Sequence, residues 1–308
     1  MRIKIIIGFF FLIFIAISFI PVSQQKELTI NATFFNIYQR LANGKYWIEW
    51  NKDLENLPSI ITNNMPDGFN ITNKQVRYQV KNQGYNFLVS KFYENTHIEY
   101  GFVIVPQKFT DSTEIITSEK TTILGSIINK FKEKSEPFEH IKEFKLYMET
   151  PSLYYGFNIV KKRVTDTNII VLKKLVLTKD KFTEAKKSFE KLKLYLVKNH
   201  LKQTQPLMAQ YIAKANDSIE VNIGIPIDKV AKSTNEIHFL RMPNTGSLYI
   251  LNFSGKFKDR IKAYSSVKNY FDDKHLTMPI LPFEIYLNNK LPTSENDTIN
   301  IELRCSTY

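Results

Sequence analysis

The segment MPILPFEIYLNN at residues 278–289 places one carboxylate inside an aromatic-rich run. Side chains alternate between the two faces of a strand, so Glu284 shares its face with Tyr286, while Phe283 and Ile285 take the other face. A carboxylate among aromatic rings in a recess of low dielectric attracts a cation more strongly than it does in water. The rings add cation–π attraction. The segment therefore predicts a ligand-binding position at Glu284, provided that its face lines a recess.

The rest of the chain offers little catalytic chemistry. The five histidines show no metal-ligand spacing such as H-E-x-x-H. The sequence contains no G-x-S-x-G elbow, no P-loop and no dinucleotide-binding glycine pattern. Cys305 is the only cysteine, which excludes an intrachain disulfide and a cysteine-based metal cluster. We therefore predict no metal, no cofactor and no assigned catalytic residue, and we favour binding over catalysis.

The positive charge of the chain is unevenly distributed. The length of 308 residues is enough for two ordinary domains or one large one, and a hydrophobic content of 43% is enough for their cores. The chain carries a net charge of +12. This charge divides into +2 for residues 1–27, zero for 28–150 and +10 for 151–308. The lysine run from Lys173 to Lys198 is typical of a solvated helix face. We expect no nucleic-acid partner, because 28–150 predicts strands and no helix-turn-helix.

Residues 1–25 predict a transmembrane anchor or an uncleaved signal. Arg2 and Lys4 precede an uncharged run from Ile5 to Gln25, which is close to the length that crosses a bilayer. A cleaved signal peptide is the alternative, but its apolar core is about 7–15 residues long and ends in small residues. With both cations inside, we expect a single-pass membrane protein whose bulk lies outside the cytoplasm.

Residues 28–150 predict one α+β domain. A helical pattern begins near Phe34, a W-x-x-W motif follows at 47–50, and alternating stretches then predict an antiparallel meander. A long helical pattern covers 123–148, with Pro137 expected to kink or divide it. This order resembles the SRPBCC or START-like helix-grip family. The resemblance implies a hydrophobic cavity between sheet and closing helix; core packing of both tryptophans is the other interpretation.

Residues 151–308 predict two ββαββ units that repeat with a period near eighty residues. Matching Tyr211 with Tyr286 sets Ala209 against Glu284, so the repeat does not require a carboxylate in both copies. We expect the two units to pair about a pseudo-twofold axis. Their sheets should lie side by side, with both helices on one face and a cleft where the units meet.

Four strings in this region resemble the GyrI-like effector-binding domain, which also occurs in AraC- and MerR-type regulators: YYGFNIV, GIPI, RMPNTGSLYILNFSGKF and PFEIYLN. The resemblance covers nearly all of 151–308. It implies a duplicated α+β fold whose central cleft binds small apolar or cationic molecules. In that family an acidic residue on a late strand commonly lies in the cleft, and the matching position here is Glu284. The aromatic candidates for the cleft wall are Tyr155, Tyr249, Phe253 and Tyr286.

These patterns together predict an α+β protein with an anchor at 1–25, a START-like domain at 28–150 and a duplicated GyrI-like domain at 151–308. The predicted function is a membrane-anchored, non-catalytic binding protein for a small apolar or cationic molecule. One alternative is an enzyme of hydrolase or cyclase type that uses Glu284 as general base. Another is a structural or interaction protein of the cell envelope. The ligand's identity and the oligomeric state do not follow from the sequence.

Overall fold

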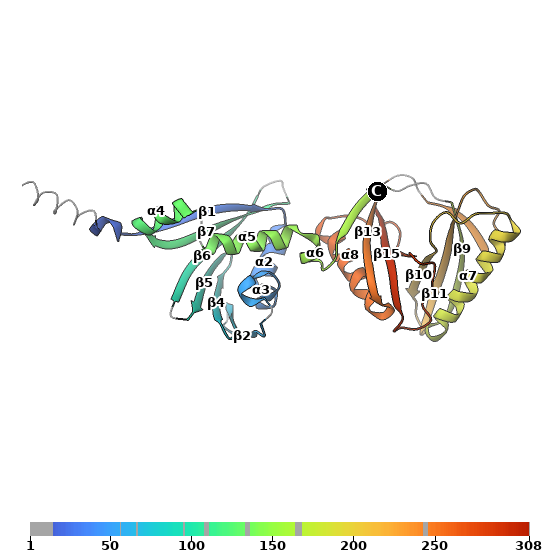
Figure 1. The fold of residues 1–308 in the computed structure, drawn as a ribbon, viewed down its shortest axis with the longest axis horizontal. Coiled ribbons are helices and arrows are strands. Elements are labelled where there is room, and N and C mark those ends of the chain that lie inside the picture. The colour runs from blue at the N-terminus through green and yellow to red at the C-terminus, as the bar shows by residue number, and fades with distance from the viewer. Residues whose placement is uncertain are drawn as a thin grey trace, which may run out of the picture. The chain divides into compact units, whose positions relative to one another are not determined.

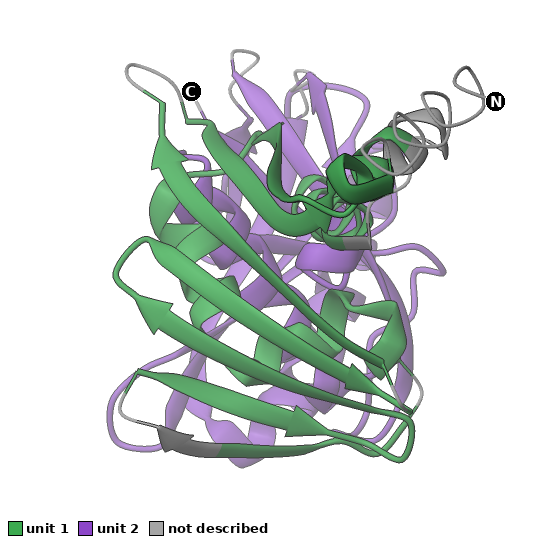
Figure 2. Cartoon of the chain, turned by 90° about the vertical axis from the view of Figure 1, so that its left-hand side faces the viewer, with its two compact units in different colours: residues 1–150 green, residues 151–308 purple. Residues whose placement is uncertain are grey.

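The computed structural model describes residues 15–307, apart from residues 56, 66, 95, 108–110, 133–135, 164–167 and 243–245. The chain divides into two compact units, residues 1–150 (unit 1) and 151–308 (unit 2), which Figure 2 distinguishes by colour. Each unit combines an antiparallel sheet with helices (Figure 1). The α+β class is therefore as predicted.

Unit 1 contains a seven-stranded antiparallel sheet in the order β1-β7-β6-β5-β4-β3-β2. Its strands are β1 (Pro21–Ile30), β2 (Ile60–Met65), β3 (Gly68–Thr72), β4 (Val76–Gln83), β5 (Asn86–Tyr93), β6 (Thr96–Pro106) and β7 (Thr113–Thr122). Its helices are α2 (Phe34–Ala42), α3 (Gly44–Trp50), the 3-10 turn η1 (Lys52–Leu54), α4 (Ile123–Lys132) and α5 (Glu136–Glu149). Buried and more exposed residues alternate along β4 and β6, so one face of the sheet forms the core.

The first strand overlaps the segment predicted as an anchor. β1 pairs with β7 along its whole length, from Pro21↔Thr122 to Ile30↔Thr113. Residues 21–25, which the prediction assigned to the anchor, therefore belong to the sheet of unit 1. Their side chains alternate in exposure, as on a strand. Residues 1–14 of the predicted anchor lie outside the described residues, and no helix from residue 15 onward is long and apolar enough to cross a bilayer.

The closing helix of unit 1 is divided into two, α4 and α5. Pro137 is the second residue of α5. The first N–H groups of a helix have no intrahelical partner, so a proline there removes no hydrogen bond. The helical pattern predicted over 123–148, which Pro137 was expected to kink or divide, is thus two helices, and the proline lies in the first turn of the second.

Both tryptophans of the chain are core residues of unit 1. Trp47 is fully buried, its ring centre lies 4.9 Å from that of Trp50, and its Nε1–H donates to the carbonyl oxygen of Leu41 at 2.9 Å. The Trp50 ring lies 5.1 Å from Phe144 of α5. Aromatic rings therefore occupy the space between α3 and α5, and core packing describes these two side chains.

Unit 2 contains an eight-stranded antiparallel sheet in the order β12-β9-β11-β10-β14-β15-β13-β8. Its strands are β8 (Ile159–Arg163), β9 (Asn168–Leu177), β10 (Met208–Ala213), β11 (Ser218–Ile227), β12 (Ile237–Arg241), β13 (Ser247–Lys256), β14 (Phe283–Tyr286) and β15 (Thr298–Thr307). Its helical segments are α6 (Pro151–Tyr154), η2 (Thr178–Asp180), α7 (Lys181–Lys198), η3 (Phe257–Arg260) and α8 (Ile261–Asp273).

The two halves of unit 2 exchange their first strands. β8 pairs with β13, and β12 pairs with β9, so each half supplies one edge strand to the other. The predicted arrangement, with the two sheets side by side, did not include this exchange. The halves meet where β10 pairs with β14, through Met208↔Ile285 and Ala209↔Glu284.

Short connections force this sheet to curve. β12 and β13 are six positions apart in the strand order, yet only five residues lie between Arg241 and Ser247, so six residue steps must span the distance. Strands in a flat sheet lie about 4.8 Å apart, so six positions would span about 29 Å, whereas six residues reach about 21 Å at most. Met242, directly after β12, packs against a cluster that includes Leu248 of β13 and Phe283 of β14. The sheet therefore curves toward the face that carries these side chains.

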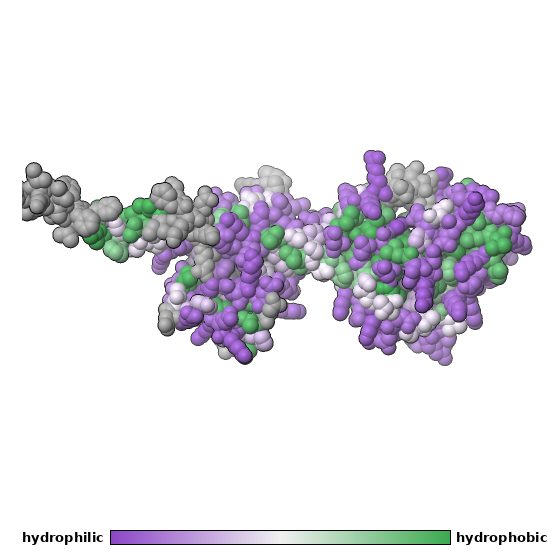
Figure 3. Space-filling view, viewed as in Figure 1, coloured by the Kyte–Doolittle hydropathy of each residue, from purple (hydrophilic) through white to green (hydrophobic). Residues whose placement is uncertain are grey.

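The opposite face carries the two long helices. α7 packs on β9 and β11, and α8 packs on β13 and β15. Their inward residues join one core cluster, to which α7 contributes Ala185, Phe189, Leu192 and Leu196 and α8 contributes Ala263, Val267 and Phe271. The visible surface of unit 2 is mostly hydrophilic, with separate hydrophobic patches (Figure 3).

The single thiol of the chain should report unfolding of unit 2. Cys305 of β15 is fully buried, and this burial raises its pKa to about 12. Thiolate is the reactive form, so we expect no alkylation of the native protein at neutral pH and rapid alkylation in denaturant. Mass spectrometry after an iodoacetamide pulse measures both, and rapid labelling of the native chain would contradict the buried position.

Candidate functional site

Glu284 lies at the centre of the sheet of unit 2. It belongs to β14, where its backbone is paired with Ala209 on one side and Leu303 on the other. Its side chain is fully buried. The carboxylate points to the face covered by the helices, because its hydrogen-bond partners include Tyr264 of α8. The small Ala209 side chain beside it leaves space for larger groups around the carboxylate.

Three donors surround the carboxylate of Glu284. Its Oε1 accepts hydrogen bonds from Nε of Arg260 and from Oη of Tyr264, both at 2.8 Å. Its Oε2 accepts a hydrogen bond from Oη of Tyr286 at 2.6 Å. A buried charge needs such partners, because burial without them costs many kcal/mol. The charge of Glu284 is therefore compensated within the chain.

Arg260 occupies the cation position beside Glu284. Its guanidinium carbon lies 3.4 Å from the ring centre of Phe257 and 5.5 Å from that of Tyr211. Its Nη1 also donates to the backbone carbonyl of Phe257 at 3.0 Å. The arginine side chain is 17% exposed. The cation that the sequence suggested as a ligand is thus, in this structure, a side chain at the edge of solvent.

The tyrosines of this cluster are weak acids. Burial, followed by the nearby charge of Glu284, raises the pKa of Tyr264 and of Tyr286 well above 10, so both hydroxyls stay protonated donors at neutral pH. The same two causes raise the pKa of Tyr211. The shielded Oη of Tyr211 makes no hydrogen bond within the described part of the chain. This hydroxyl is a polar group with unused bonding capacity beside the ion pair.

The predicted site residues fall into separate groups. Tyr286 bonds directly to Glu284. Tyr155 and Tyr249 both lie against Tyr270 of α8, with ring centres 5.3 Å and 5.6 Å away, and Tyr155 donates a hydrogen bond to Asp273. Phe253 lies 6.3 Å from the ring centre of Phe157. None of these three makes a described hydrogen bond to Glu284.

Sequence reasoning missed Arg260 and Tyr264. They are four residues apart, spacing that places two side chains on the same helix face. That signal links the two residues to each other but not to a carboxylate 24 and 20 residues later. Only the packing of α8 on the sheet brings them to Glu284.

Unit 1 has its own cluster of titratable groups, which sequence reasoning also missed. The Asp53 carboxylate lies 3.3 Å from Nε2 of His140 and 2.7 Å from Nζ of Lys91, and it accepts a hydrogen bond from Tyr78. Nδ1 of His140 lies 3.0 Å from Oη of Tyr100. The hydrogen bond from His140, followed by those from Lys91 and Tyr78, lowers the pKa of Asp53 despite its partial burial. The cluster ties η1 and α5 to β4, β5 and β6.

No protein-family model matches this chain, and no curated protein matches it either. Solved structures similar to parts of it include the EcmrR–DNA complex in EcmrR-RPo, at 13% identity over 61% of this chain and 78% of that one, with a TM-score of 0.40. The EcmrR C-terminal domain is 15% identical over 49% of this chain and 98% of that domain, with a TM-score of 0.36. A START superfamily protein from Mycobacterium smegmatis is 17% identical over 41% and 97%, with a TM-score of 0.30. All three scores are below 0.5, so these likenesses carry no functional argument.

Removal of the Glu284 charge should destabilise unit 2 strongly. Glu284→Gln leaves Arg260 without its counter-charge, and breaking a buried pair in this way costs about 3–5 kcal/mol. Chemical denaturation followed by Cys305 alkylation measures the loss. Replacing both partners together, as Glu284→Leu with Arg260→Met, should cost less than Glu284→Gln alone.

Glu302→Gln is the matched control for this experiment, because the Glu302–Arg304 pair of the same sheet is 20% exposed on both sides. Its loss should be smaller than that of Glu284→Gln, since exposed pairs contribute less. Equal losses would show that burial gives the Glu284 pair no special weight.

Unit 1 should lose stability in acid through Asp53. Its folded pKa lies below the ordinary value of 3.8, so the unfolded chain binds a proton more readily than the folded one. The stabilisation is present above about pH 4 and is lost as the pH falls further. Tryptophan fluorescence follows unit 1 alone, since both tryptophans lie there. Asp53→Asn should remove this acid step and Asp67→Asn should keep it; an unchanged step in Asp53→Asn would refute the assignment.

Proposed function

We propose that unit 2 binds a small molecule with a positive charge and an apolar surface at Glu284. The observation that supports this proposal is a fully buried carboxylate, bonded by two tyrosines, whose counter-charge is a single arginine stacked on an aromatic ring. Such a cage is suited to cations, since the carboxylate and the rings attract positive charge together.

A ligand would bind by replacing the guanidinium of Arg260. This side chain reaches the carboxylate from the solvent side and retains 17% exposure, so it can leave without opening the sheet. The incoming cation takes over the attraction of Glu284 and the stacking on Phe257. The unused hydroxyl of Tyr211 offers it a further hydrogen bond. Burial of its apolar surface, at about 25 cal/mol per Å², offsets the loss of the internal ion pair.

The wall of this site is proposed to consist of Tyr286 beside the carboxylate, with Tyr155, Tyr249 and Phe253 as further aromatic contacts. Tyr155 and Tyr249 share Tyr270 of α8 as a neighbour. A ligand with an extended apolar body would lie along that helix toward these rings.

We also propose that unit 2 is a duplicated ββαββ domain of the GyrI-like kind. Its strand order supports this. From one edge of the sheet the strands after the exchanged one are β9, β11 and β10, and from the other edge they are β13, β15 and β14, the equivalent strands of the second half. Unit 1 is proposed as a START-like domain. The part of the predicted anchor that precedes β1, residues 1–20, is proposed as a single-pass anchor that holds the bulk of the chain outside the cytoplasm. On this proposal the chain has no nucleic-acid partner.

The geometry favours binding over catalysis at Glu284. A general base needs a pKa near the working pH and an accessible oxygen. Here both oxygens accept hydrogen bonds from a guanidinium and from tyrosines that hold their protons tightly. Neither oxygen is therefore open to accept a proton from a substrate. We therefore propose a non-catalytic role over a hydrolase or cyclase.

Removal of Arg260 should convert the cage into an open cation site. In Arg260→Ala the buried carboxylate lacks its counter-charge, so we expect a lower melting temperature than in the wild type. Tetraphenylphosphonium should raise the melting temperature of Arg260→Ala more than that of the wild type, because it supplies the missing charge. Differential scanning calorimetry of the full chain measures both.

Two controls test whether stabilisation by tetraphenylphosphonium depends on the charge of Glu284. The double variant Arg260→Ala with Glu284→Gln should respond to tetraphenylphosphonium no more than the wild type does. Arg304→Ala, which breaks the partly exposed pair with Glu302, should show no rescue. Equal stabilisation of all variants, or none in Arg260→Ala, would rule out a cation site at Glu284.

A further inference from the structure

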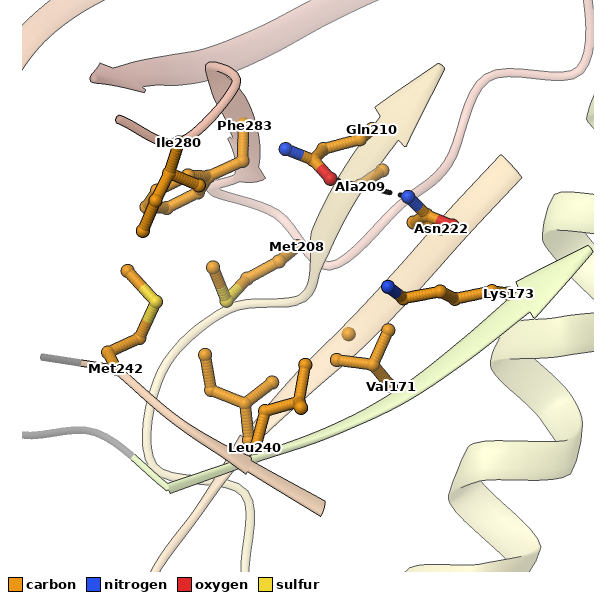
Figure 4. Close-up of a pocket in the computed structure, with 12 residues that line it drawn as sticks. Val171, Lys173, Met208, Ala209, Gln210, Asn222, Leu240, Met242, Ile280 and Phe283 are labelled. Atoms are coloured by element: carbon orange, nitrogen blue, oxygen red, sulfur yellow. Dashed lines mark hydrogen bonds between the residues drawn. The ribbon is translucent and has the colours of Figure 1, made fainter. Parts of the chain in front are cut away.

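The face of the unit 2 sheet away from α7 and α8 contains a hollow of about 210 Å³. One side of it is apolar and is formed by side chains of both halves, namely Ile169, Val171, Met208, Leu240, Met242, Ile280 and Phe283. The other side is polar and is formed by Lys173, Gln210 and Asn222. Figure 4 shows these two sides opposite each other, with Met208 between them. The hollow is separate from Glu284, whose carboxylate points to the helix-covered face.

A glycine at the floor produces this hollow. Gly224 of β11 is paired with Met208 on β10 and with Val171 on β9, so its missing side chain leaves a gap between two larger ones. A Cβ there would lie 3.3 Å from Ile169 and 3.5 Å from Met208. The strand that takes the place of β11 in the other half is β15. Gly224 lies seven residues after Asp217, and the residue seven positions after Asp297 is Arg304. The position that corresponds to Gly224 in the other half therefore carries a large side chain.

The polar side is one row across three strands. Gln210, Asn222 and Lys173 are direct cross-strand neighbours, so their side chains stand next to one another. Nδ2 of Asn222 donates to Oε1 of Gln210 at 3.3 Å and to Oε1 of Glu220 at 2.9 Å. Nε2 of Gln210 donates in turn to the backbone carbonyls of Leu281 and Pro282. These bonds fix the orientation of both amides and make Oδ1 of Asn222 an acceptor.

That acceptor has no partner. Asn222 is 7% exposed, and its shielded Oδ1 accepts no hydrogen bond within the described part of the chain. A buried polar atom without a partner destabilises the protein, so it marks a place where a donor fits. Beside it stands the exposed ammonium of Lys173, which can only donate. A ligand group at this position must therefore give one hydrogen bond and take another.

We propose that this hollow binds an apolar molecule that carries a single hydroxyl group. The hydroxyl donates to Oδ1 of Asn222 and accepts from Nζ of Lys173, while the apolar body lies against Met208, Met242 and Phe283. A carboxylate cannot donate to Asn222, and an ammonium cannot accept from Lys173, so both fit less well. The volume exceeds the roughly 150 Å³ of a cavity that holds benzene, so a body of about eight carbons fits.

The test is a titration of the full chain, labelled with ¹³C at the methionine methyl groups, against 1-octanol, octanoate and octylammonium. We expect saturable shifts of the Met208 and Met242 signals, with 1-octanol binding most tightly. Asn222→Leu should weaken the binding of 1-octanol about fivefold, which corresponds to the loss of one hydrogen bond. The same substitution should leave the binding of octanoate unchanged. Saturating tetraphenylphosphonium should not compete with 1-octanol, which separates this site from the proposed cation site.

Gly224→Val should abolish binding, because its side chain fills the floor of the hollow. Protection of Cys305 from alkylation verifies that this variant is folded. Leu175→Ala, on the same face of β9 but outside the lining, should bind as the wild type does. Absence of saturable shifts, full binding by folded Gly224→Val, or equal affinity for all three headgroups would overturn the proposal.

Discussion

The ion pair between Glu284 and Arg260 is the interaction on which unit 2 depends. The carboxylate lies at the joint between the two halves of the sheet, and the guanidinium lies directly before α8. The pair therefore fixes the position of that helix on the sheet. Because the carboxylate is fully buried, its charge must always be compensated, and anything that competes for it also acts on the start of α8. Binding of a cation at this point, as proposed, would therefore be coupled to the folding of unit 2.

The alternation of residues 282–288 was sufficient to place Glu284 on one face with Tyr286, but not to identify its partners. Strand periodicity states which residues share a face and says nothing of what covers that face. The exchange of β8 and β12 could not be predicted for a similar reason, since a strand has the same pattern beside either neighbour. β1 was hidden because its first residues continue the uncharged run that suggested an anchor. The positions of strands were thus readable, whereas their pairing was not.

The two faces of the unit 2 sheet carry different polar groups. On the helix face, a charge is buried and every oxygen of Glu284 has a donor. On the curved face, a glycine leaves space and one amide oxygen of Asn222 is left without a donor. Polar groups in a protein interior are normally satisfied, so Oδ1 of Asn222 on this face is an exception, as is Oη of Tyr211 on the helix face. Unit 1 resembles the helix face, since Asp53 is fully engaged by its neighbours.

The exchanged edge strands make the two halves of unit 2 depend on each other. The outer neighbour of β9 is β12 and the outer neighbour of β13 is β8, so each half supplies an edge to the sheet of the other. A fragment that contains one half alone would expose an unpaired strand edge. Because both halves belong to one polypeptide, they complete each other at any concentration. The joint between them can also carry different residues on its two sides, as Ala209 and Glu284 do.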